Sequence, residues 1–177
     1  MIALISFYFK LNNFYIGEIR NNILTMDVID KKIVDLLQLD ARLSAREIAE
    51  KVGLTPAPCW RRIQRLENEG VISSRVALIS PKKVNLSVSA VVEIRTNRHN
   101  ADWLRQFTSA LEKFPEIVEA YRTSGEVDYM LRVVAPDMET YDLFYKKLVE
   151  EVDLYDVTSH FVMEEMKKTT ALPLQYC

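Results

Sequence analysis

A cluster of guanidinium and amide side chains between residues 61 and 65 is the part of this sequence best suited to chemistry. Arg61, Arg62 and Arg65 provide cationic groups, and Gln64 adds an amide. Guanidinium groups bind phosphate oxygens, and Arg or Gln on a helix reads base edges in the major groove of DNA. The stretch 55–66 contains no Asp or Glu that would repel phosphate. We therefore interpret the cluster as a nucleic-acid-binding surface, in preference to an ordinary solvated helix face.

Two short helices joined by a tight turn are the elements that must position this cluster. Ser44 and Glu47 have the spacing of a capping box, which starts a helix, and Gly53 suits the positive φ that ends it. Thr55 is the expected N-cap of the second helix, with Pro56 in its first turn. Such a pair of helices is typical of a helix-turn-helix.

The second helix divides into two faces at about 100° per residue. Its inner face carries Cys59, Ile63 and Leu66, and Cys59 is expected to be a small buried hydrophobe, with a redox-sensing thiol as the alternative. Trp60 is expected to pack on the first helix, which Asp27 caps, with stacking on sugar-phosphate as the alternative. Arg75, which follows the helix, either touches phosphate or is a surface linker residue. The predicted DNA-contacting residues are Thr55, Ala57, Pro58, Arg61, Arg62, Gln64, Arg65 and Arg75.

Charge is distributed unevenly along the 177 residues. The net charge is −2 overall, made up of +1 over residues 1–25, +3 over residues 26–86 and −6 over residues 87–177. This asymmetry indicates one part that faces DNA and another that does not. The small positive charge of the first part implies that affinity depends on local placement and on more than one copy of the binding domain.

Several classes of site have no support in the sequence. Cys59 and Cys177 are the only cysteines, which fits a reducing cytoplasm rather than a disulfide framework. His99 and His160 are the only histidines and lack metal-site spacing, so neither a metal nor another cofactor is predicted. No nucleophile–base pair is visible, so we do not expect an enzyme or catalytic residues. A protein-interaction module whose basic helix binds an acidic partner is a further alternative, which a salt-dependent shift of promoter DNA would distinguish.

Residues 1–25 differ in character from the rest of the chain. Ile2–Phe9 is a largely apolar run, far shorter than the roughly 20 residues that span a bilayer, so no membrane association is predicted. The segment also lacks the basic start and the cleavage site of a signal peptide. We expect either a start assigned upstream of the true first residue, Met26, or a real extension that packs on the body.

The hydrophobic periodicity changes at Ser87. Alternating strand patterns and helical patterns then follow in the order β-α-β-β-α-β, with strands near 88–94, 117–123, 129–134 and 157–163 and helices near 103–114 and 137–152. This order is the ferredoxin-like split motif, in which both helices lie on one face of an antiparallel sheet. The predicted fold class is α+β, a winged helix-turn-helix joined to this ferredoxin-like domain. The other sheet face needs a cover, which a second copy of the chain would provide.

Residues 26–173 resemble the Lrp/AsnC (feast/famine) family of transcription regulators. The resemblance is carried by IDKKIVDLLQLDARLSAREIAEKVGL, TPAPCWRRIQRLENEGVI, TSGEVDYMLRV and VTSHFVMEEMKKTTALPL. It implies a DNA-binding domain and a ligand-sensing (RAM-type) domain that dimerises, with assembly to an octamer on pseudo-palindromic double-stranded DNA. The words PCW, DVTS and KKTTALP are similar to a cysteine-responsive branch, so cysteine is the expected effector, with a leucine-type or other amino acid as the alternative. Ala57 departs from many members and offers a base only apolar contact.

The resemblance also implies domain limits and an effector site. The implied parts are a helix-turn-helix at 26–73, a linker strand at 74–86, an effector-binding and oligomerisation domain at 87–173 and a tail at 174–177. The implied effector residues are Tyr121, Thr123, Ser124, Gly125, Asp128 and Tyr129. Asp128 would accept the ammonium group of an amino acid, and N–H groups near Gly125 would bind its carboxylate. From the residues alone, the same stretch is an ordinary hairpin turn. We expect a cytoplasmic DNA-binding regulator, with an architectural DNA-binding protein of the same fold as the alternative.

Overall fold

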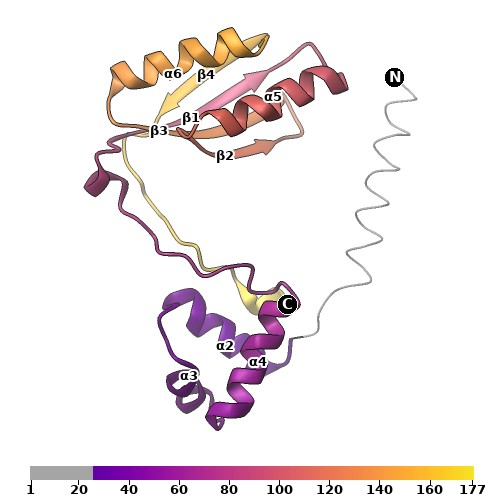
Figure 1. Ribbon diagram of the computed structural model, residues 1–177, viewed down its shortest axis with the longest axis vertical. Helices are drawn as coiled ribbons and strands as arrows, with labels where there is room; N and C mark the ends of the chain where they lie inside the picture. The colour runs from indigo at the N-terminus through magenta and orange to yellow at the C-terminus, as the bar shows by residue number, and fades with distance from the viewer. Residues whose placement is uncertain (1–25) are drawn as a thin grey trace. The chain divides into compact units, whose positions relative to one another are not determined.

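The computed structural model describes residues 26–177, which form two compact units (Figure 1). Among the described residues, the helical unit contains residues 26–76 together with Thr169–Cys177, and the sheet unit contains Ala77–Lys168. The expectations for residues 1–25 lie outside the described residues. Within residues 26–177, no helix combines the length and apolar character that crossing a membrane requires.

The helical unit contains three helices in a helix-turn-helix arrangement. They are α2 (Val28–Leu39), α3 (Ala45–Val52) and α4 (Pro56–Asn68). The predicted capping box starts α3: the Glu47 carboxylate accepts the Ser44 N–H at 2.8 Å, and the Ser44 hydroxyl accepts the Glu47 N–H at 3.3 Å. Gly53 follows α3 at φ 76°, in the left-handed region that glycine enters without steric cost. The predicted turn between α3 and α4 is therefore confirmed.

The start of α4 differs from the sequence prediction in one respect. Thr55 has the extended backbone of an N-cap, yet its side chain makes no capping hydrogen bond. A capping hydroxyl accepts the N–H of the second or third helical residue, and the third residue here is Pro58, which has no N–H. Thr55 is exposed, so its hydroxyl remains accessible from outside the helix.

The core of the helical unit is aliphatic and includes residues from both ends of the described chain. Its buried members are Ile33, Val34, Leu37, Ile48, Ala49, Cys59, Ile63 and Leu66. Leu174 packs against this cluster, and the Gln38 amide on α2 exchanges hydrogen bonds with the Leu172 backbone at 2.6 and 3.3 Å. The Lys31 ammonium donates to the Cys177 carbonyl. The segment Thr169–Cys177 thus belongs to the helical unit, whereas the expected division put 87–173 in the second domain and left 174–177 as a tail.

The extended stretch after α4 does not form the expected wing or linker strand. Residues 73–80 have neither helical nor strand structure and lead into a 3-10 turn, η1 (Pro81–Val84). Val76, Leu78 and Ile79 are between 64% and 69% exposed in this stretch. Its β-like pattern finds no partner strand within residues 26–177, and an unpaired strand has no ladder to stabilise it.

The sheet unit has the predicted β-α-β-β-α-β order. Its elements are β1 (Val88–Arg95), α5 (Ala101–Lys113), β2 (Ile117–Arg122), β3 (Tyr129–Ala135), α6 (Met138–Glu151) and β4 (Asp156–Phe161). The strands pair antiparallel in the order β2-β3-β1-β4, and α5 and α6 lie on one face of the sheet (Figure 1). The predicted α+β ferredoxin-like fold is therefore confirmed.

Aromatic rings fill the space between the sheet and its two helices. The Phe107 ring lies 5.0 Å from the ring of Trp103 and 4.7 Å from that of Tyr129, measured between centroids. On α6, the Phe144 ring meets the Phe114 ring edge-on at 5.5 Å. Such ring pairs stabilise a core beyond the free energy of area burial alone. They fix α5 and α6 on one face of the sheet, and no other element of the sheet unit covers the opposite face.

Candidate DNA and effector sites

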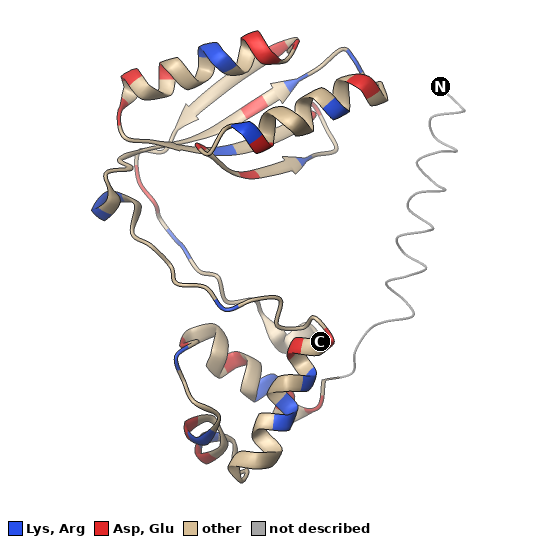
Figure 2. Ribbon diagram, in the orientation of Figure 1, with Lys and Arg blue, Asp and Glu red and all other residues tan. Residues whose placement is uncertain are grey.

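The outer face of α4 presents a guanidinium group that is available to a ligand. Thr55, Ala57 and Arg61 are exposed, and the first turn of the helix contains no acidic residue. The ion pairs of α4 involve Arg62 and Arg65, and none joins Arg61 to an acid within residues 26–177. Figure 2 shows basic positions in the middle of α4 and acidic positions at its last turn. The first half of α4 is therefore the part of the helix that a phosphate backbone can approach without repulsion.

Arg62 and Arg65 point toward α2 and bind its acidic residues. Arg62 lies 2.6 Å from the Asp27 carboxylate and 2.7 Å from that of Asp30, and Arg65 lies 2.5 Å from the other Asp30 oxygen. Asp30 is only 1% exposed, so it meets both arginines out of water. The Asp30 N–H, followed by the Arg62 guanidinium, lowers the pKa of Asp27. Both arginines thus hold α4 on α2, a role that the sequence did not predict because helical spacing does not show which acid lies opposite.

Gln64 and Arg75 are both bound to Glu67. The Gln64 amide donates to the Glu67 carboxylate at 2.7 Å, and the Arg75 guanidinium pairs with its other oxygen at 2.7 Å. Pro58 is partly buried in the first turn. The structure therefore gathers the predicted DNA-contacting residues on and beside one helix, while giving Arg62, Gln64, Arg65 and Arg75 partners inside the helical unit.

Trp60 and Cys59 are neighbours with opposite surroundings. Trp60 is 55% exposed, so the prediction that it packs on the first helix, α2, is wrong. Its indole extends the outer face that holds Ala57 and Arg61, since residues three and four apart share one side of a helix. Cys59 is fully buried, and burial raises the pKa of its thiol. A buried, protonated thiol is inert, which supports the small-hydrophobe interpretation over the redox sensor.

The predicted effector residues between β2 and β3 form a hydrogen-bonded loop. The Thr123 N–H donates to the Asp128 carbonyl at 2.9 Å, and one Asp128 carboxylate oxygen accepts the Thr96 N–H at 2.8 Å. The other Asp128 carboxylate oxygen has no hydrogen bond to any residue in the described part of the chain. Ser124 and Gly125 are exposed, and Gly125 has φ 145°, which side chains with a Cβ rarely adopt. The loop therefore offers a carboxylate oxygen and an exposed backbone close together.

Tyr121 and Tyr129 do not meet at this loop, although the sequence placed both there. Tyr121 is 57% exposed, and its hydroxyl donates to Glu119 at 3.0 Å, a bond that raises the pKa of Tyr121. Tyr129 packs against Phe107 on the face covered by helices. Side chains alternate between faces along a strand, and Tyr121 pairs with Met130, the neighbour of Tyr129. The two tyrosines therefore lie on opposite faces of the sheet.

The face of the sheet opposite α5 and α6 mixes charged and apolar side chains. The Arg132 guanidinium lies 2.6 Å from the Glu119 carboxylate and lowers the pKa of that carboxyl group. Val91 on β1 pairs with Arg132, and Met130 pairs with Tyr121, so apolar side chains surround the ion pair. No element of the sheet unit covers this face. Its composition suits contact with another protein surface rather than with phosphate.

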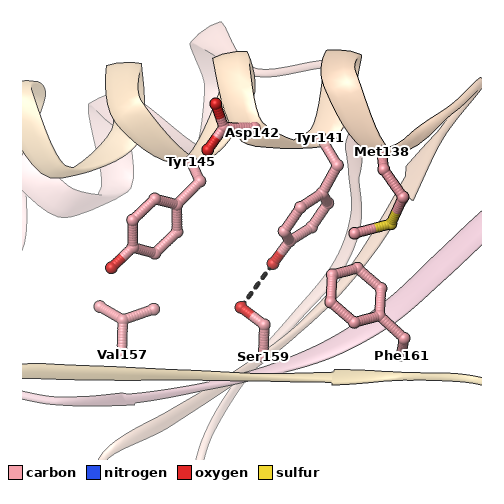
Figure 3. Close-up of a pocket in the computed structure, with 7 residues that line it drawn as sticks. All are labelled: Met138, Tyr141, Asp142, Tyr145, Val157, Ser159 and Phe161. Atoms are coloured by element: carbon pink, nitrogen blue, oxygen red, sulfur yellow. Dashed lines mark hydrogen bonds between the residues drawn. The ribbon is translucent and has the colours of Figure 1, made fainter.

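An open pocket lies between α6 and β4 (Figure 3). Its volume is about 330 Å³, and its lining residues are Met138, Tyr141, Asp142, Tyr145, Val157, Ser159 and Phe161. The Tyr141 hydroxyl donates to the Ser159 hydroxyl at 2.6 Å and joins the helix to the strand. None of the predicted effector residues lines this pocket.

The fold and the exposed face of α4 are those of a DNA-binding regulator with an attached ligand-sensing domain. Residues 26–73 match the model of winged helix-turn-helix DNA-binding domains, and residues 89–172 match that of the Lrp/AsnC ligand binding domain. The chain belongs to the Lrp/AsnC family of DNA-binding transcription regulators, whose members are regulators rather than enzymes.

Several relatives align over nearly their whole length. The DNA-binding transcriptional activator DecR of Escherichia coli is 45% identical over 151 residues, which is 85% of this chain and 99% of DecR. The glutamate uptake regulatory protein of Zymomonas mobilis is 46% identical over 84% of this chain and 91% of its own. An AsnC family regulator from Agrobacterium tumefaciens has a TM-score of 0.82 and 52% identity, covering 85% of this chain and 99% of that one. A Neisseria meningitidis transcriptional regulator solved with L-Met has a TM-score of 0.82 and 36% identity, covering 86% and 99%.

Proposed function

We propose that this chain binds a pseudo-palindromic operator in a sequence-specific manner and that the outer face of α4 reads it. The observation that carries this proposal is the exposed Arg61, which has no acidic partner within residues 26–177, on a helix whose first turn has no acid. Arg61 contacts a base edge, Thr55 donates its hydroxyl to phosphate, and Ala57 and Trp60 line the contact. Arg62, Gln64, Arg65 and Arg75 support this surface through their bonds within the helical unit.

Substitution of Arg61 tests the reading role directly. Arg61→Ala weakens binding to a duplex selected from a random library by about 1–3 kcal/mol and relaxes the preference at one base position. Arg105→Ala removes the same charge from an exposed position on α5 of the sheet unit. It leaves DNA binding at the level of the unchanged chain. Gel shifts of both variants on selected and random duplexes provide the comparison. Equal losses on both duplexes for Arg61→Ala would refute base reading.

A small amino acid is the proposed effector, and the loop around Asp128 is its proposed site. The Lrp/AsnC ligand binding domain and the L-Met complex of the Neisseria relative support an amino acid. The unused Asp128 oxygen suits a ligand ammonium, and the exposed backbone of Ser124 and Gly125 suits a ligand carboxylate. Cysteine is the first candidate, on the local words PCW, DVTS and KKTTALP, and a leucine-type amino acid is the alternative. A ligand that binds the folded state raises the melting temperature, so a thermal-shift screen of the twenty amino acids ranks them.

Asp128→Asn separates ligand binding from loop structure. The amide oxygen of Asn still accepts the Thr96 N–H, so the loop keeps its hydrogen bond, while the charge that a ligand ammonium needs is gone. We expect the affinity for the amino acid that scores in the screen to fall by roughly 10–100-fold, because hydrogen bonds to charged groups contribute about 1.5–3 kcal/mol. Glu126→Gln is the matched control, since Glu126 lies in the same loop and is 94% exposed. Calorimetry that gave the same affinity for Asp128→Asn and the unchanged chain would reject this site.

Self-association completes the proposed function. The open sheet face around Glu119 and Arg132 packs against the same face of a second copy, and dimers assemble further into an octamer. Two copies present two α4 helices, which matches a pseudo-palindromic operator and raises affinity through multivalency. Because it acts on chromosomal DNA, the protein works in the cytoplasm. Light scattering across a dilution series gives the mass, and a strictly monomeric chain would contradict this part of the proposal.

An architectural DNA-binding role is the second candidate. It is favoured by the small net charge of +3 over residues 26–86, which suits many weak contacts spread over several copies. An architectural protein would bind selected and random duplexes within a few-fold of each other. A specific regulator discriminates by roughly 10³ or more at physiological salt.

A further inference from the structure

A buried carboxylate, Asp30, contacts α4 from inside the helical unit. It is 1% exposed, and it accepts from Arg62 at 2.7 Å through one oxygen and from Arg65 at 2.5 Å through the other. The second oxygen also accepts the Asp27 N–H at 3.2 Å, which closes the capping box of α2. Burying a carboxylate is costly unless it is paired and hydrogen-bonded, so Asp30 depends on both arginines.

The position of the two arginines makes Asp30 a clamp on helix rotation. Arg62 and Arg65 lie three residues apart, on adjacent turns of one side of α4, so a single carboxylate binds the helix at two points. Two bonded points on one side oppose rotation of α4 about its axis. Arg61 is offset from Arg62 by about 100° around the helix, so holding Arg62 inward turns Arg61 outward.

The same ion pairs neutralise the positive charges of Arg62 and Arg65. Asp27, Asp30, Arg62 and Arg65 carry two negative and two positive charges and sum to zero. A cation contributes to DNA affinity by neutralising phosphate and releasing counterions, and a guanidinium already neutralised by a carboxylate does not. Arg61 has no acidic partner within residues 26–177, so its charge remains available to DNA.

The geometry points to Asp30 as the positioning residue of the DNA-reading helix. It locks α4 on α2, withholds Arg62 and Arg65 from phosphate, and leaves Arg61 as the cation of α4 that meets DNA. This inference rests on the proposed function of α4. It concerns how many cations of the helix bind phosphate, and this number is measurable without knowledge of the operator or the effector.

Asp30→Asn in the full chain is the primary test, with Asp35→Asn as the matched control. Asp35 lies on the same helix, is exposed, and forms no ion pair within the described residues, so both changes remove one negative charge. We measure the salt dependence of binding to a random-sequence duplex and the ratio of affinities for selected and random duplexes. For Asp30→Asn, the log–log slope becomes steeper by up to about 0.9 for each released arginine, and the ratio falls at least about five-fold. Asp35→Asn keeps both quantities at the values of the unchanged chain. Identical results for the two variants would overturn the inference.

A second pair of variants decides the question if circular dichroism shows that Asp30→Asn does not fold. Arg65 is 44% exposed, and Arg65→Gln leaves Asp30 paired with Arg62. Arg65→Gln leaves the salt slope unchanged, whereas Arg61→Gln reduces it by about 0.9 for each phosphate that Arg61 neutralises. Equal reductions of the salt slope for both variants would show that Arg65 also binds phosphate. That result would overturn the inference that Asp30 withholds Arg65 from DNA. Failure to select any preferred duplex would instead count against the proposed function and leave this slope measurement intact.

Discussion

The two units of this chain keep their functional side chains in place by different means. Among the described residues, the helical unit has an aliphatic core without a buried aromatic ring. Side-chain caps start α2 and α3, and the Asp30 ion pairs orient α4. The sheet unit relies on stacked rings such as Trp103 and Phe107. Directional ion pairs fix the orientation of α4, whereas packed rings fill the core of the sheet unit. We therefore expect the orientation of α4 to be sensitive to single polar substitutions and the stability of the sheet unit to be sensitive to cavities.

Phe107→Ala is expected to give the largest effect and to act on the sheet unit. Phe107 is 1% exposed at the centre of the ring stack, and truncating a buried Phe costs about 3–5 kcal/mol. Trp103 is 4% exposed and stacks on Phe107, so in a Trp60→Phe background the fluorescence of Trp103 in a urea titration follows this unit. Leu104→Ala, at a position 42% exposed on the same helix, should change the free energy of unfolding by less than about 0.5 kcal/mol. Similar losses for both variants would contradict the ring-packed core.

Gly53→Ala is expected to destabilise the helical unit by about 1–2 kcal/mol. The cost is conformational, because Gly53 has φ 76° and nothing lies within 4 Å of a Cβ built there. Gly53→Asn should lose less, since Asn tolerates the left-handed region better than Ala does. Thermal melts followed by far-ultraviolet circular dichroism provide the ranking. A reversed order would show that packing rather than backbone conformation limits this turn.

Ser44→Ala and Thr55→Ala compare the starts of the two helices of the motif. The Ser44 hydroxyl accepts a hydrogen bond from the Glu47 N–H, and losing such a cap lowers the free energy of unfolding by about 1 kcal/mol. Thr55 makes no capping bond, so Thr55→Ala should leave stability within about 0.5 kcal/mol and should instead weaken DNA binding. Paired melts and gel shifts measure both quantities. A stability loss at Thr55 as large as that at Ser44 would remove the argument that the Thr55 hydroxyl is kept for DNA.

The smallest expected effect is that of acid on the stability of the helical unit, through Asp40 and Glu47. The Arg42 guanidinium lowers the pKa of Asp40 from 3.8 to about 2, and the Ser44 hydroxyl lowers that of Glu47. A lowered pKa in the folded state adds stability above the unfolded pKa, and this stability is lost as pH falls through the folded pKa. Helical circular dichroism should therefore weaken between about pH 4 and pH 2, and Asp40→Asn should flatten this part of the profile. An unchanged profile for Asp40→Asn would contradict the contribution of the Asp40–Arg42 pair.

Local patterns predicted the elements of both units because caps and periodicities act over a few residues. The Ser44–Glu47 box, the turn at Gly53 and the alternation of β1 all appear in the structure as the sequence indicates. The start of α4 was predicted in position but not in its hydrogen bond. Pro58 removes one of the two possible donors to the Thr55 hydroxyl, and this is visible in the sequence once the helix register is known.

Contacts between distant residues were not predictable from one sequence. Arg62 was assigned to DNA, since nothing local shows that Asp30, 32 positions away, lies opposite it. The sequence predicts that Trp60 is packed, yet its side chain is 55% exposed. The separation of Tyr121 and Tyr129 depends on strand register, which a loop of uncertain length does not define.

The contact of residues 172–174 with the helical unit affects the order in which the two units complete their folding during synthesis. The ribosome makes Leu174 only after the whole sheet unit, Ala77–Lys168, which takes roughly ten seconds at about 5–20 residues per second. During that interval the helical unit lacks a side chain of its final core and the Gln38–Leu172 hydrogen bonds. The helical unit thus reaches its full stability only after the sheet unit has been synthesised.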